Sequence, residues 1–282
     1  MSIARDYGTC RNARTPADAR STAIGAKRVL ERAEEMGSGA LMLKGPNNSS
    51  IGAILIERGR LCWAVCNACP RRLSDILVEE SSSLTNAQVT EVVRECRQTG
   101  VPLGETLLSR GMVSQEALHR ALLHHTSVAL DHLIRADGEG WTWVAHTRQG
   151  YSPILTFSAT EVLVEMTRLF EPEQSAQAAA VLQPISPPWL SSLALRRVAG
   201  GRTPIAQVRC EHVELASLSR ISRQADEILS VASIAALRIA ILEMSDLSFA
   251  AWGEDANQYV LLCKGKLAFN RLLAHISSLN II

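Results

Sequence analysis

The sequence has few aromatic residues, almost no net charge and no long apolar run. Phe, Trp and Tyr make up 4% of the 282 residues, so any core must consist mainly of aliphatic side chains and alanine. The net charge of +1 gives no long-range attraction toward nucleic acid or an anionic membrane. No run approaches the roughly 18 apolar residues of a membrane-spanning helix. We therefore expect neither nucleic-acid binding nor membrane insertion.

The N-terminus also lacks the apolar segment of an export signal. Arg5, Arg11, Arg14 and Arg20 are not followed by an apolar core, so we expect residues 1–21 to be a disordered basic tail. The seven cysteines are an odd number in a chain too long to need disulfide staples. They favour a reducing environment, and we expect a cytoplasmic protein with free thiols.

A tandem repeat at residues 72–125 organises the first half of the chain. The matched pairs are Leu73 with Leu103, Leu77 with Leu107, Val89 with Leu118 and Val93 with Leu122, at spacings of 30, 30, 29 and 29 residues. Each copy predicts a short helix, a turn and a longer amphipathic helix. Thr85 with Gln88 has the pattern of a capping box, and Ser114 can cap the second long helix. Such helices need a covering partner for their apolar faces.

Short strand-like runs flank this repeat. They lie at 40–44, 52–57 and 60–65 before it and at 141–146 after it. Gly59 predicts a tight hairpin turn between the second and third runs. A helix is expected over 23–36, and Ser158 with Glu161 predicts the capped start of a closing helix. The sequence thus predicts an α+β domain: a small antiparallel sheet with a helical-hairpin insertion at 70–136.

The order of these segments resembles the PATAN domain of bacterial signalling proteins. The resemblance rests on GAILIERGRLCWA at 52–64, on LGETLLSRGMVSQEALHRALLHH at 103–125, and on a Trp-containing strand followed by ATEVLVEMTRLFE at 159–171. It covers residues 22–172. It implies a protein-interaction or signal-relay role without catalysis.

The second half predicts a connector and another small α+β domain. Residues 173–189 are rich in Pro, Ala and Gln and predict a linker. In the domain at 190–282 we expect a turn at 200–204, a helix at 215–232, strands at 237–243, 247–252 and 258–264, and a last helix through 267–276. This layout resembles the back half of a roadblock-type domain, a family that serves small GTPases and motor complexes.

Three cysteines have the spacing of a possible metal site. Cys62, Cys66 and Cys69 match the cluster-binding loop of radical-SAM enzymes, whose thiolates hold an iron–sulfur cluster. A zinc site would need a distant fourth ligand such as His146 or Cys96. However, Cys62 lies inside a predicted hairpin strand, and no glycine-rich motif for the co-substrate follows. We expect small buried thiols and no cofactor, with the iron–sulfur or zinc protein as an alternative.

The repeat also resembles a nucleotide-binding motif. In the N-terminal domain of secretion and pilus ATPases, a tandem motif opened by Arg-Leu-Gly binds cyclic di-GMP. Here Arg72-Leu73-Ser74 opens the first copy and Pro102-Leu103-Gly104 the second, and His125 replaces the terminal Gln. Arg would bind phosphate or guanine, and Gly would allow close backbone approach. Half of each motif is missing, so a cyclic di-GMP sensor is a second alternative.

We predict a non-catalytic signalling adaptor, acting in two-component, motility or pilus regulation. A partner helix or loop would dock in a groove between the two long helices of the insertion. The predicted rim residues are Arg72, Arg94, Arg110 and His125. We expect Trp141 and Trp143 to face opposite sides of their strand, one in the core and one, with Trp141 as candidate, anchoring the partner. The expected partners are a response regulator, kinase, pilus motor or small GTPase, and a homodimer is an option.

Overall fold

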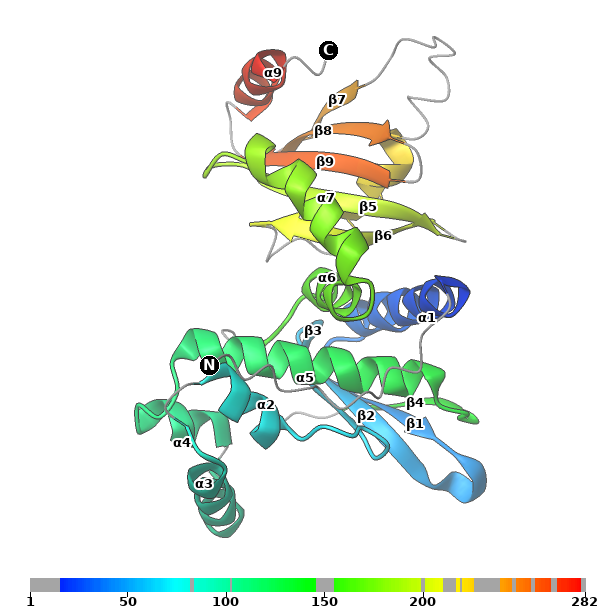
Figure 1. The fold of residues 1–282 in the computed structure, drawn as a ribbon. Coiled ribbons are helices and arrows are strands. Elements are labelled where there is room, and N and C mark those ends of the chain that lie inside the picture. The colour runs from blue at the N-terminus through cyan, green and yellow to red at the C-terminus, as the bar shows by residue number, and fades with distance from the viewer. Residues whose placement is uncertain are drawn as a thin grey trace.

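The computed structural model describes most of the chain beyond residue 15. The described ranges are 16–81, 84–101, 103–145, 155–198, 201–209, 217–218, 220–225, 239–244, 247–254, 257–264 and 268–279. They form two antiparallel sheets with helices packed on and between them, which confirms the α+β class (Figure 1). No described helix has both the length and the apolar character needed to cross a membrane.

The first sheet has the strand order β3-β2-β1-β4, with every neighbouring pair antiparallel. Its strands are β1 (Gly39–Lys44), β2 (Ser50–Glu57), β3 (Arg60–Cys66) and β4 (Gly140–Ala145). Arg58 and Gly59 join β2 to β3 with φ of 52° and 76°. Two consecutive positive φ values match the twist of a tight hairpin, so the predicted turn is confirmed.

The tandem repeat forms four helices between β3 and β4, as the spacing predicts. They are α2 (Leu73–Glu80), α3 (Asn86–Thr99), α4 (Leu103–Ser109) and α5 (Gln115–Arg135). The side chains of Thr85 and Ser114 cap the two long helices. Helix α2 packs on α5, and α4 packs on α3, so each short helix contacts the long helix of the other copy. Helix α3 lies at the end of the molecule far from the second sheet, with α4 beside it (Figure 1).

Helix α1 (Pro16–Glu35) begins earlier than predicted. The prediction of a disordered tail at 1–21 is wrong from residue 16 onward. Pro16 suits the first turn of a helix, and the Ala and Arg residues that follow it favour helix. Residues 1–15 lie outside the described part. Helices α1, α5 and α6 (Ala159–Phe170) contact one another beside the first sheet. Leu30, Ile54 and Phe157 lie fully buried in their shared core.

The predicted linker is instead a packed helix, α7 (Pro172–Ile185). Pro172 occupies the first turn, where its missing N–H is tolerated, and Ala and Gln favour helix up to Pro184 in the last turn. Ala178 and Leu182 are buried in a cluster with the second sheet. The prediction of a loose connector is therefore wrong over 173–185.

The second sheet has the order β6-β5-β9-β8-β7. Its strands are β5 (Ser191–Val198), β6 (Gly201–Val208), β7 (Ile239–Met244), β8 (Leu247–Glu254) and β9 (Asn257–Lys264), and α9 (Ala268–Ser278) follows. The last three strands and α9 match the predictions. Of the helix predicted at 215–232, residues 217–218 and 220–225 are described, and they are helical.

The β5–β6 hairpin was not predicted, and the turn expected at 200–204 is mostly strand. Residues 201–204 belong to β6, where Pro204 is buried. Proline has no N–H to donate to a neighbouring strand. It is tolerated in β6 because β6 is an edge strand, which has a hydrogen-bonded neighbour on one side only.

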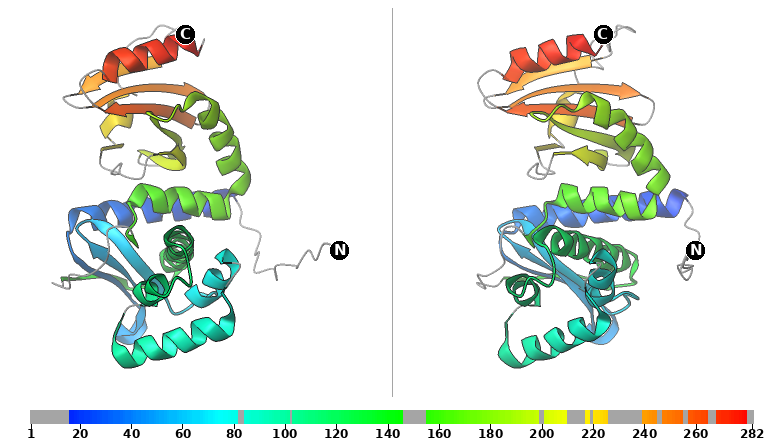
Figure 2. Two further views of the ribbon diagram at one scale, coloured as in Figure 1. Left: turned by 90° about the vertical axis from the view of Figure 1, so that its left-hand side faces the viewer. Right: turned by 60° about the vertical axis from the view of Figure 1, so that its left-hand side comes forward.

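Helix α6 lies between the two sheets and contacts β6 of the second one (Figure 2). One continuous core cluster contains Leu30 and Leu61 from the first unit together with Leu193 and Leu195 from β5. At the corner between α6 and α7, Glu171 accepts hydrogen bonds from Arg196 of β5, with Nη2 at 2.9 Å from Oε1. The two units therefore share a packed interface.

Candidate interaction surface on the helical insertion

All three of the predicted partner-binding arginines lie on the surface of the insertion. The side chain of Arg94 on α3 is 66% exposed and pairs with Glu91. Arg110, directly after α4, is 43% exposed and pairs with Glu95 across to α3. Arg72 is exposed at the N-cap of α2. Arg94 and Arg110 thus both lie on the α3–α4 pair of helices.

His125 is not a rim residue, so its prediction as an exposed contact is wrong. It is 6% exposed, and its ring stacks on Trp63 with centroids 4.4 Å apart and planes 9° from parallel. Burial lowers the pKa of His125 to about 4, with a smaller contribution from His124. Helix α5 packs against β3, and this contact buries His125. The sequence of the helix alone does not predict it. The last position of the nucleotide-binding motif is therefore buried.

Trp141 and Trp143 lie on the same face of β4, not on opposite faces as predicted. Residues two apart in a strand share a face. Trp141 pairs with Leu43 and Trp143 with Leu41, and both leucines are buried. Both tryptophans are half-buried and pack against the core. Trp141 is thus a core-edge residue.

The contacts of the insertion also alter the expected docking groove. Because α2 packs on α5 and α4 on α3, the short helices lie against the two long ones. The surface that carries the exposed arginines is instead the outer side of the α3–α4 pair. We call this the α3–α4 surface, defined by Glu91, Arg94, Glu95, Val101 and Arg110. Val101 is an exposed apolar residue in the connection between the two helices.

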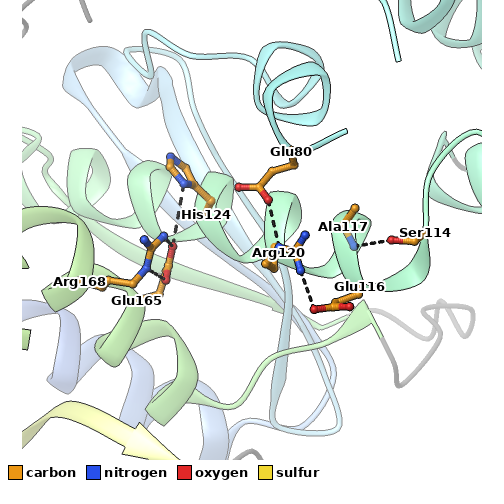
Figure 3. A network of polar contacts seen from close by, with 8 residues as sticks. All are labelled: Glu80, Ser114, Glu116, Ala117, Arg120, His124, Glu165 and Arg168. Atoms are coloured by element: carbon orange, nitrogen blue, oxygen red, sulfur yellow. Dashed lines mark hydrogen bonds and ion pairs between the residues drawn. The ribbon is translucent and has the colours of Figure 1, made fainter. Parts of the chain in front are cut away.

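Another polar network ties α5 to its neighbours (Figure 3). Arg120 donates to Glu80 of α2 at 3.0 Å and to Glu116 at 2.7 Å. On α6, Glu165 accepts two hydrogen bonds from Arg168, at 2.7 and 2.6 Å, and lies 4.0 Å from Nδ1 of His124. Each carboxylate in this network has a cationic neighbour, so the network joins α2, α5 and α6.

Two cysteines of the possible metal site, Cys62 and Cys69, have a raised pKa. The Sγ of Cys62 donates to the carbonyl of Arg60, and burial, with Glu57 nearby, raises its pKa to about 12. Burial also raises the pKa of Cys69, whose Sγ donates to the carbonyl of Arg71. A metal would need the deprotonated form of these groups. Within the described ranges, no three His, Cys, Asp or Glu side chains are grouped to hold a metal ion. His146 lies outside these ranges, and Cys96 instead contacts Oγ1 of Thr106 at 3.3 Å.

The fold and this surface define a class: a two-sheet α+β protein with a surface-exposed helical insertion. Comparison of the chain with family models, with curated proteins and with solved structures finds no match.

Proposed function

We propose that this protein is a non-catalytic signalling adaptor that binds a protein partner through the α3–α4 surface. The observation that carries the proposal is the position of two exposed arginines, Arg94 and Arg110, on a helix pair at the periphery of the molecule (Figure 1). Arginine is favoured at protein interfaces because its planar guanidinium binds carboxylates through two parallel hydrogen bonds.

The ion pairs of these arginines suit exchange with a partner. Exposed pairs contribute little to the stability of a fold, since water screens them and long side chains lose entropy in them. Arg94 and Arg110 can therefore leave Glu91 and Glu95 at small cost when a partner presents its own carboxylates. Val101 adds an apolar contact beside them.

The chemistry of the described side chains favours recognition over catalysis. A nucleophilic cysteine or a histidine base is usually tuned toward neutral pH. Here the pKa values of Cys62 and Cys69 are raised, and His125 is neutral and buried. These shifts arise from packing in the core.

The arrangement of elements supports the two family resemblances. Helix α1, strands β1–β3, the helical insertion, β4 and α6 follow in the order that the PATAN resemblance implies. The last part of the chain resembles only the back half of a roadblock-type domain. Helix α7 and the β5–β6 hairpin come directly before that part, in the position that the front half of such a domain would occupy. We accordingly propose a response regulator, kinase, pilus motor or small GTPase as partner.

The test compares three tagged forms of the full chain in lysate of its own host. They are the wild type, the double variant Arg94→Glu/Arg110→Glu, and the control Arg28→Glu, which reverses an exposed charge on α1. Quantitative mass spectrometry should find a co-purifying protein that the double variant loses by about tenfold or more and that the control retains. Circular dichroism should show equal folding of all three. If the same proteins co-purify equally with all three forms, the α3–α4 surface is not the docking site.

A further inference from the structure

The first sheet has a second face that no described helix covers. Across the four strands its side chains form two registered rows. One row is Leu55, Ala40 and Val144, and the next is Val65, Ala53, Met42 and Thr142. Trp63, beside Leu55 on the edge strand β3, is not part of this face because its ring stacks on His125 of α5. We call these seven residues the open sheet face. The opposite face carries the buried Leu41, Leu43 and Ile54, and the helices of this unit lie on that side (Figure 2).

The open sheet face is apolar and partly exposed. Every one of its residues except Thr142 is apolar, and Val65 and Val144 are 42% and 46% exposed. The other five are half-buried or exposed as well. A solvent-facing side of an antiparallel sheet normally carries polar residues. A contiguous apolar patch of this kind marks a surface that another element covers.

The charges at the ends of this face make it complementary to itself. Lys44, at the end of β1, and Glu57, at the end of β2, share the face with Met42 and Leu55 but lie at opposite ends of the strands. A twofold rotation about an axis in the plane of the sheet and across the strands places a second copy face to face with the first. Each strand then lies over its own copy, so Lys44 of one copy lies about one strand spacing, roughly 4.8 Å, to the side of Glu57 of the other. These long side chains can span that offset, which gives two ion pairs in one symmetric contact.

We propose that a second copy of this chain covers the open sheet face, so that two first sheets pack face to face. Sheets packed in this way lie about 10 Å apart with strands aligned within about 30°. Four strands at about 4.8 Å spacing and six residues at about 3.3 Å give a face of roughly 400 Å² per copy. With its flanking side chains the contact buries on the order of 1,000 Å² in total, near the lower limit for a specific interface. The dimer is therefore expected to be reversible and of micromolar affinity.

The experiment is sedimentation velocity on the purified full chain over a concentration series. The wild type should change from monomer to dimer in the micromolar range. Lys44→Glu and Glu57→Lys each place like charges opposite one another twice, and each should weaken the dimer by about tenfold or more. The double variant Lys44→Glu/Glu57→Lys restores both pairs and should dimerise as the wild type does. This rescue separates loss of contact from loss of folding.

A second variant tests the apolar part of the contact. Leu55→Glu should be monomeric at every concentration and should retain the circular dichroism of the wild type, because Leu55 faces outward in the monomer. A wild type that stays monomeric up to roughly 200 µM would overturn the proposal, as would a dimer that tolerates both Lys44→Glu and Leu55→Glu. The measurement contains no other protein, so its failure leaves the α3–α4 proposal standing.

Discussion

His125 combines burial, aromatic stacking and a ring nitrogen, Nδ1, that has no hydrogen-bond partner among the described residues. A protonated imidazole here would place a charge in the core without a compensating carboxylate. The folded state therefore holds the ring neutral, with a pKa of about 4 against an ordinary value of 6.5. Between these two values the unfolded chain binds the proton and the folded chain does not.

Stability should therefore fall as the pH is lowered from 6.5 toward 4, and should be constant for this residue above that window. At pH 4.5 the loss from His125 is about 2.5 kcal/mol relative to pH 7.5. His125→Phe keeps the stacking on Trp63 and should remove most of this loss. Urea unfolding at several pH values measures it.

The matched control for this series is His124→Gln. Burial lowers the pKa of His124 as well, although Glu165 opposes the shift, so this variant should remove a smaller part of the pH dependence. If the profile of His125→Phe runs parallel to that of the wild type, His125 does not titrate in this window.

At the scale of elements, the corner between α6 and α7 depends on one ion pair. The side chain of Arg196 is 5% exposed and that of Glu171 is 13% exposed, and Gln174 of α7 also accepts from Arg196. Arg196→Met should destabilise the fold by about 3 kcal/mol, because Glu171 is left without its cationic partner in a mostly buried place.

The second substitution Glu171→Gln, added to Arg196→Met, removes the stranded charge and should recover a large part of that loss. Chemical denaturation of the wild type, both single variants and the double variant gives the coupling energy of the pair. Additive losses would mean that Arg196 stabilises the corner through packing alone.

The elements that sequence reasoning finds are those with a clear local period or cap. The capped helices α3, α5 and α6 and the turn at Gly59 are examples, since Thr85, Ser114 and Ser158 signal their helix starts directly. Strand β5 has no such signal, because five consecutive residues are buried and the alternation of a half-exposed strand is lost. The apolar character of both sides of β2, by contrast, was a visible sign that neither face of this strand favours water.

For the candidate interaction residues, the sequence predicted exposure correctly only where exposure follows from the local helical pattern. Arg94 and Arg110 are polar positions on amphipathic helices, and they are exposed as the pattern implies. The burial of His125 depends on Trp63, a residue 62 positions earlier in the chain, so no local signal could give it. The tryptophans of β4 could have been placed correctly, because the period of two in a strand already puts Trp141 and Trp143 on one face.

At the scale of the whole molecule, the shared core joins the two sheets. Helix α6 contacts both α5 and β6, and residues of β5 belong to the same cluster as those of the first unit. A packed interface of this kind couples the unfolding of the parts that share it.

We therefore expect a single calorimetric transition, with equal calorimetric and van't Hoff enthalpies, for the full chain. Leu195→Ala, in the second sheet, should lower the temperature of the whole transition, since Leu195 is 2% exposed and its loss costs about 2–5 kcal/mol. Two separate transitions, or a shift confined to one of them, would show that the sheets unfold independently.

The pairing of β4 with β1 has a consequence for synthesis on the ribosome. The outer edge of β1 receives its neighbour only after the whole helical insertion has been translated, roughly 100 residues later. At about 5–20 residues per second, this hydrogen-bonding edge waits for roughly 5–20 s in the nascent chain. During the same interval α2 has been synthesised but α5, its main packing partner, has not. The half-made protein thus exposes an apolar strand edge, which makes it a substrate for chaperones until α5 and β4 have emerged.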